Sequence, residues 1–187
     1  MNLNRIFLGI WLTLIFFTSA SALDLQQGMH GMSWASSVSQ YPYLTKVRES
    51  DQVVYYVNSE MIYQVVNQSV TSVFYGFYKD QFFAVYTKLR TRDQFDHLKL
   101  LFSENYGKPI VEKDATGQNV VYSWKVGDGK IKVKMKESIG DIKFAVYYAP
   151  ISTILNESKL EQINLDTSDP AASKEDASVK TAPLLER

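Results

Sequence analysis

The stretch VFYGFYKDQFFAVYTKLR, from Val73 to Arg90, decides how this chain is built, because it has the pattern of a β-hairpin with aromatic residues on both faces. Seven of its residues are Phe or Tyr. These residue types favour strands, and Lys79-Asp80 supplies a two-residue turn. A sheet in a two-layer domain needs only one apolar face, so the other face of this hairpin must be covered by something else.

Strand periodicity predicts which side chains share a face. With Lys79-Asp80 as the turn, one face carries Val70, Phe74, Gly76, Phe83, Val85 and Leu89, and the other carries Val73, Tyr75, Phe77, Phe82, Ala84, Tyr86 and Lys88. The first set has no tyrosine and is expected to pack on a helix. The second set is rich in tyrosine, which suits a face that meets water. A three-residue turn through Gln81 would exchange the two faces of one strand.

Two covers are possible for the tyrosine-bearing face. The N-terminal segment contains four large apolar residues that could fold over it: Met29, Met32, Trp34 and Tyr41. Otherwise the face is exposed, and contiguous exposed apolar area usually marks a binding surface.

The remaining elements are predicted by their own patterns. Gln52–Asn58 is a β-rich run, and 91–106 has helical spacing with Thr91 and Gln94 as a capping box. A second hairpin turns at Asp128-Gly129, and its register places Trp124 opposite Val133. The final strand is 142–149. We therefore expect an α+β domain, an antiparallel sheet of about five to six strands with one main helix on one face, in the order β, β-hairpin, α, β-hairpin, β.

The two ends of the chain differ from this domain in composition. Residues 1–22 have a positive Arg5, an apolar run and small residues ending at Ala22, which is the layout of a cleaved signal peptide. We expect one domain over 23–155. Residues 156–187 are expected to form a weak helix and then a disordered tail, because they offer little to bury.

Composition excludes several classes of function. The chain has no cysteine, which removes disulfides, thiol catalysis and Cys-based zinc sites. Removing Arg5 with the signal peptide leaves 19 basic against 20 acidic residues, a balance that gives no case for binding nucleic acid. We expect a periplasmic or secreted protein, with no membrane span after cleavage and no cofactor.

Catalytic and metal-binding patterns are missing from the sequence. Its two histidines, His30 and His97, lack the spacing of a metal site, and no G-x-S-x-G or phosphate loop is present. Either histidine is most simply a surface or loop residue, although His30 could touch a ligand. A lysine row on one sheet face, Lys125, Lys132, Lys134 and Lys136, is interpreted as a solubilising feature.

Three segments carry a resemblance: GMSWASSVSQ, the Val73–Arg90 hairpin and FDHLKLLFSENYGKP. There the chain resembles small uncharacterised exported proteins of Gram-negative bacteria, and the shared motifs are structural. A remote likeness in architecture is to SmpA/OmlA and β-lactamase-inhibitor-like modules. That likeness implies binding to other proteins, and it assigns no site residue.

These observations lead to two hypotheses of function. The first is a non-enzymatic exported domain that binds a protein or a cell-envelope component through the aromatic sheet face, with five residues as anchors: Trp34, Tyr75, Phe77, Phe82 and Tyr86. The alternative is a carrier of a small apolar ligand in a pocket between the sheet and the N-terminal segment.

Overall fold

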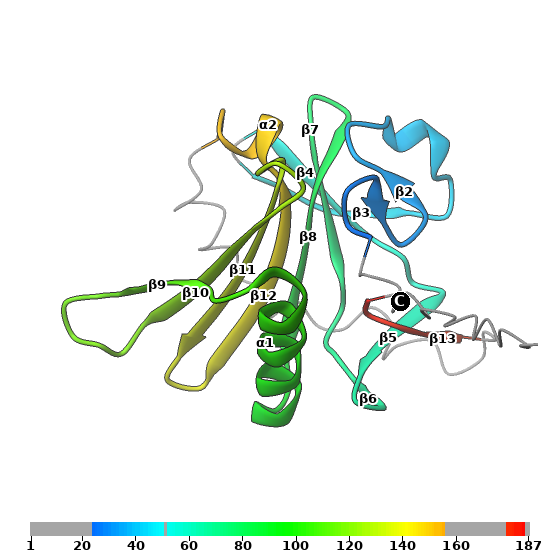
Figure 1. The fold of residues 1–187 in the computed structure, drawn as a ribbon. Helices are drawn as coiled ribbons and strands as arrows, with labels where there is room; N and C mark the ends of the chain where they lie inside the picture. The colour runs from blue at the N-terminus through cyan, green and yellow to red at the C-terminus, as the bar shows by residue number, and fades with distance from the viewer. Residues whose placement is uncertain (1–23, 51, 156–178, 186–187) are drawn as a thin grey trace, which may run out of the picture.

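A computed structural model describes residues 24–50, 52–155 and 179–185, and its centre is one large antiparallel sheet (Figure 1). Eight strands lie in the spatial order β3 (Thr45–Ser50), β4 (Val53–Val57), β7 (Phe74–Tyr78), β8 (Gln81–Leu89), β12 (Asp141–Tyr148), β11 (Ile131–Ser138), β10 (Val120–Val126) and β9 (Ile110–Lys113). Every neighbouring pair in this order is antiparallel.

Smaller elements lie against this sheet. Helix α1 (Arg92–Tyr106) runs along one face, and α2 (Ala149–Ser152) is a single turn at the end of β12. The N-terminal segment forms a small hairpin of β1 (Gly28–Met29) and β2 (Met32–Ser33), followed by a 3₁₀ turn at Val38–Gln40. A separate three-stranded sheet has the order β13 (Lys180–Pro183), β5 (Met61–Val65) and β6 (Gln68–Ser69).

The expected α+β class and its five to six strands are wrong. The described residues form 13 strands and two short helices, so the protein is mainly β. Two of the strands that the sequence did not predict, β3 and β9, are the edge strands of the large sheet. In β3 and β9 almost every residue is exposed, so these strands have no apolar alternation by which a pattern could be recognised. They form because their backbone groups pair with a neighbouring strand.

The local predictions hold better. Helix α1 begins with the expected capping box, in which the Thr91 hydroxyl accepts from the Gln94 amide and the Gln94 side chain accepts at the N-cap. The β10–β11 hairpin has Trp124 opposite Val133, as predicted. Asp128 and Gly129 both have positive φ, which is what a type I′ turn requires.

The predicted faces of the central hairpin are wrong along β8. The turn is at Lys79-Asp80 as expected, with Tyr78 opposite Gln81, but Gly76 pairs with Ala84 while Phe77 pairs with Phe82. One extra residue in β8 is therefore a β-bulge, and it exchanges the faces of everything beyond it. Two groups result: Tyr75, Phe77, Phe82, Val85 and Leu89 lie in the core with α1, whereas Phe74, Phe83, Ala84 and Tyr86 lie in the core on the opposite face.

Gly76 shows why the second core needs this arrangement. A Cβ atom at Gly76 would lie 3.1 Å from a Tyr86 ring carbon and 3.2 Å from a Phe83 ring carbon. Both rings are buried. The glycine therefore leaves the space into which the bulged strand turns its aromatic rings.

Candidate binding groove beside the C-terminal strand

Four of the five predicted anchors lie together in the interior. Trp34 is 9% exposed and Tyr75, Phe77 and Phe82 at most 1%. The rings of Trp34 and Phe82 stack at 4.7 Å, and the Trp34 indole N–H donates to the Leu25 carbonyl at 2.8 Å. The structure therefore covers this aromatic face with the chain's own residues, which include the four large apolar residues of the N-terminal segment.

The fifth predicted anchor, Tyr86, lies elsewhere. It belongs to the core on the opposite face of the sheet, where its ring meets Tyr147 edge-on at 5.4 Å and Tyr55 at 5.9 Å. The bulge in β8 is the reason. The five anchors therefore do not form one surface.

The same bulge ties the N-terminal segment to the sheet. The Ala35 amide donates to the Phe82 carbonyl at 2.8 Å, and the Phe82 amide donates to the Ser36 carbonyl at 2.9 Å. Ser37 adds a hydroxyl hydrogen bond to Asp80 at 2.5 Å. Backbone bonds thus hold the segment over the aromatic face, and the pairing does not depend on side-chain burial alone.

One edge of β5 takes up the C-terminal end of the described chain. β13 runs parallel to β5, with Lys180 opposite Met61 and Pro183 opposite Gln64. The Lys180 amide donates to the Glu60 carbonyl at 2.9 Å, and the Leu184 amide donates to the Gln64 carbonyl at 2.8 Å. The tail was predicted to be disordered to its end, whereas residues 180–183 form a strand. The predictions for 1–22 and 156–178 lie outside the described residues.

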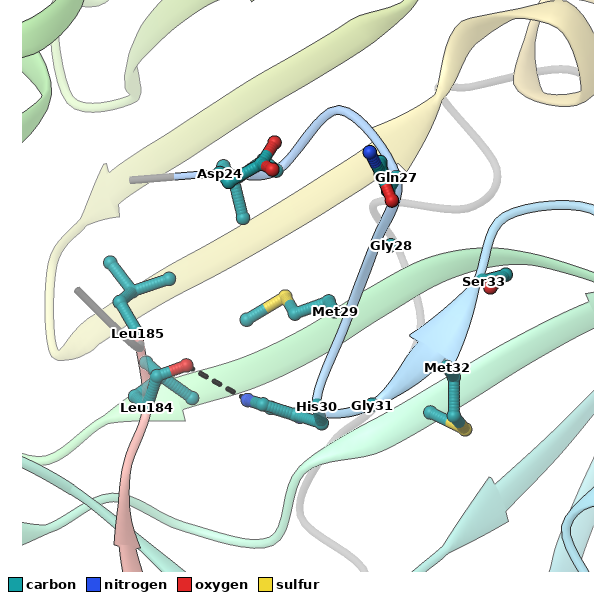
Figure 2. Close-up of a pocket in the computed structure, with 11 residues that line it drawn as sticks. Asp24, Gln27, Gly28, Met29, His30, Gly31, Met32, Ser33, Leu184 and Leu185 are labelled. Atoms are coloured by element: carbon teal, nitrogen blue, oxygen red, sulfur yellow. Dashed lines mark hydrogen bonds between the residues drawn. The ribbon is translucent and has the colours of Figure 1, made fainter. Parts of the chain in front are cut away.

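His30 joins the N-terminal hairpin to this strand (Figure 2). It sits with Gly31 at the two-residue turn between β1 and β2, where both residues have positive φ. Histidine tolerates this left-handed conformation better than most residues. Its Nε2 donates to the Leu184 carbonyl at 2.8 Å, and its ring stacks on Tyr63 of β5 at 4.1 Å.

Gly28 makes that hairpin possible. A Cβ atom on Gly28 would lie 1.8 Å from the Met32 carbonyl oxygen, so no side chain fits there. The backbone can close the turn only with glycine at this position, and the turn is what aims His30 at β13.

A chain of polar groups runs from His30 into the core. Nδ1 lies 2.9 Å from the Tyr75 hydroxyl, which is hydrogen-bonded to the Tyr63 hydroxyl at 2.7 Å. Since Nε2 must donate to a carbonyl, a neutral ring accepts at Nδ1 from Tyr75. A Tyr75 hydroxyl that donates to Tyr63 instead requires a proton on both ring nitrogens.

Burial decides the charge state of this cluster. It lowers the pKa of His30 to about 4, although the hydrogen bond to the Leu184 carbonyl opposes this shift. Burial also raises the pKa of Tyr75, and the neighbouring Tyr63 adds to that effect. At neutral pH the cluster is therefore uncharged.

Two hollows flank the C-terminal strand. One, of about 270 Å³, lies between the N-terminal hairpin and Leu184 and Leu185, and Asp24 is at its rim (Figure 2). The other, of about 350 Å³, lies between α1 and the strands β5 and β13, and its lining includes Val65, His97, Leu98, Leu101, Pro183 and Leu185. We call the edge of β5 together with these two hollows the β5 groove.

The described residues offer no assembled metal site and no helix that could cross a bilayer. The site residues that sequence reasoning missed are Tyr63, Leu184 and the role of His30. A signal for Leu184 was present, since Leu184 and Leu185 are the only adjacent large apolar residues of the tail after Asp166.

No known protein family, curated protein or solved structure matches this chain. The resemblance to exported Gram-negative proteins therefore stays a prediction that rests on the three quoted segments.

Proposed function

We propose that this chain is a non-enzymatic binding domain that takes up an extended segment of a protein partner by strand addition to β5. The observation that carries the proposal is the docking of residues 180–184 on that strand. An extended segment that adds to a sheet edge gains affinity from backbone hydrogen bonds, and pockets for alternate side chains supply specificity. The β5 groove has both of these features.

The proposed binding surface is the β5 groove and not the aromatic sheet face that the sequence suggested. Tyr75 supports the groove from inside through its hydrogen bonds with His30 and Tyr63, and the residues that face an occupant are His30, Tyr63 and the edge of β5. Export remains part of the proposal, on the strength of the N-terminal signal pattern, with a protein of the cell envelope or the secreted space as the partner.

The experiment uses the full-length Leu184→Asp variant, in which the buried anchor of the chain's own strand is replaced by a charge. Random twelve-residue peptides displayed on phage are selected on this variant, and hydrogen exchange is then measured with the selected peptides. We expect the amides of Met61–Val65 to be protected. Selection of no peptide, or of peptides that protect another surface, would overturn the proposal.

A small apolar ligand is the second candidate. The hollow of about 350 Å³ between α1 and β13 is near the lower limit for ligand pockets, and most of its lining is aliphatic. Native mass spectrometry of protein purified from its host tests this candidate. A bound small molecule that is lost in Leu101→Trp, which fills the hollow, would support it, and the bare chain mass alone would rule it out.

A further inference from the structure

We propose that residues 180–184 act as a built-in competitor that occupies the β5 groove in the resting chain, and that the partner presents the same pattern, an apolar side chain directly after proline in a strand parallel to β5. This inference rests on the proposed function. It goes further by stating which kind of segment binds and what limits access to the β5 groove.

The position of Pro183 supports the pattern. Lys180 and Leu184 both donate their amides to β5, so the twofold period of a strand points the amide of every second residue toward β5. Pro183 falls between these positions, on the edge that faces away from β5. Its missing N–H therefore costs no bond to β5, and proline there prevents a further strand from adding.

Leu184 is the anchor of the segment. It is 1% exposed and packs in the core cluster with Met29, Tyr63 and Val65. By contrast, Lys180, Thr181 and Pro183 are exposed, and Ala182 is half-buried. The groove therefore selects one apolar side chain by burying it, whereas the proline before it acts through the backbone, by closing the outer edge of the strand.

His30 binds the main chain of the segment that occupies the groove. Its contact with residue 184 is to the carbonyl oxygen, a group that every extended peptide presents. A partner segment that places an apolar residue in the anchor position also places a carbonyl within reach of His30. Recognition then needs no second buried side chain.

The tether gives the chain's own segment its advantage. A four-residue strand with one buried side chain makes only a small contact. Without its covalent link the segment would therefore be replaced readily by a partner. Residues 156–178 join it covalently to the domain, so its docking is intramolecular and is governed by an effective concentration. A free partner must compete with that concentration. Its apparent affinity is therefore its intrinsic affinity multiplied by the fraction of chains whose groove is open.

The test measures binding of a fluorescein-labelled VKTAPLLER peptide, the sequence of residues 179–187, to full-length variants. We expect Leu184→Asp to bind this peptide at least about tenfold more tightly than the wild type, because its own segment no longer competes. Thr181→Asp places the same charge at an exposed position of β13 and should bind like the wild type. A VKTAPDLER peptide should bind to none of them.

Different failures have different meanings. Equal affinity of the wild type and Leu184→Asp for VKTAPLLER, or equal binding of both peptides, would overturn the inference and leave the proposed function standing. If Leu184→Asp selects other peptides that protect β5 but does not bind VKTAPLLER, the inference also fails. If it neither selects nor binds any peptide, both fail.

A second variant tests the inference if Leu184→Asp does not fold. A protease site is inserted within 156–178 of the wild-type sequence and cut after purification, which removes the tether without changing the groove. We expect the released segment to leave on dilution and the labelled peptide to replace it. Failure of the labelled peptide to bind once the segment has left would overturn the inference.

Discussion

The His30 ring donates from Nε2 to the carbonyl oxygen of Leu184 at 2.8 Å, although 154 positions separate the two residues. This bond joins a tight turn near the start of the domain to the last described strand. It is also the contact through which pH acts on the groove.

Acidification should loosen β13. The pKa of His30 is lowered from 6.5 to about 4 because the ring is buried, so the docked state binds the proton less readily than an open state. Stability from docking is complete above pH 6.5 and is lost as the pH falls toward 4. The loss is at most about 3 to 4 kcal/mol, from a shift of roughly 2.5 pKa units at roughly 1.4 kcal/mol for each unit.

The measurement is hydrogen exchange at the amides of Met61–Val65 between pH 7.5 and pH 4.5, corrected for the intrinsic pH dependence of exchange. The groups around His30 are the hydroxyls of Tyr63 and Tyr75 and the Asp24 carboxylate at the rim of the hollow. His30→Asn keeps a residue that tolerates positive φ and removes the titrating group. An equal loss of protection in this variant would contradict the assignment to His30.

Removal of the Tyr75 hydroxyl should destabilise the fold by about 1 to 3 kcal/mol. Tyr75→Phe keeps the ring in the core but removes the group that links His30 to Tyr63. The check is urea denaturation at pH 7.5, where His30 is neutral. Tyr43→Phe is the matched control, since Tyr43 is 40% exposed and should change the midpoint little. Equal midpoints for the two variants would show that the polar chain contributes nothing.

Gly28→Ala should uncouple the N-terminal hairpin from the groove. The new Cβ atom cannot lie 1.8 Å from the Met32 carbonyl oxygen, so the turn must open and His30 must move. We expect faster exchange at β5 but no tighter binding of VKTAPLLER than in the wild type, because loss of the His30 contact weakens the chain's own segment and the peptide alike. Gly117→Ala serves as a control for backbone strain alone, because Gly117 has a positive φ, which Gly28 does not, and its Cβ would meet nothing within 4 Å. A wild-type exchange pattern in Gly28→Ala would refute the role of the hairpin.

Gln94→Ala should cost more stability than Thr91→Ala. Loss of the Thr91 cap is worth about 1 kcal/mol. Gln94 also belongs to the capping box, but it is fully buried and its side-chain amide donates to the Gln68 carbonyl at 2.9 Å. Its removal leaves that acceptor without this donor, so we expect about 2 to 3 kcal/mol. Thermal or urea denaturation of both variants decides the order, and the reverse order would show that α1 is not anchored to β6 through Gln94.

Much of the local structure could be predicted. The capping box, the β10–β11 register and the turn at Lys79-Asp80 all depend on residues that are near one another in the chain. The possibility that Met29, Met32, Trp34 and Tyr41 cover the aromatic face was also visible in the sequence. The edge strands β3 and β9 were not, because exposed residues carry no periodic signal of burial.

By itself, the sequence determined that Val73–Arg90 is a hairpin, that 92–106 is a capped helix and that the chain holds no thiol chemistry, since these properties depend on residue type and short spacing. Only the tertiary structure decided which face each aromatic ring joins, because one bulged residue in β8 reverses that choice. It alone also decided that Leu184 returns to β5 beside His30. Pairing between segments so far apart depends on which strand edges the rest of the fold leaves open, and no local pattern records that.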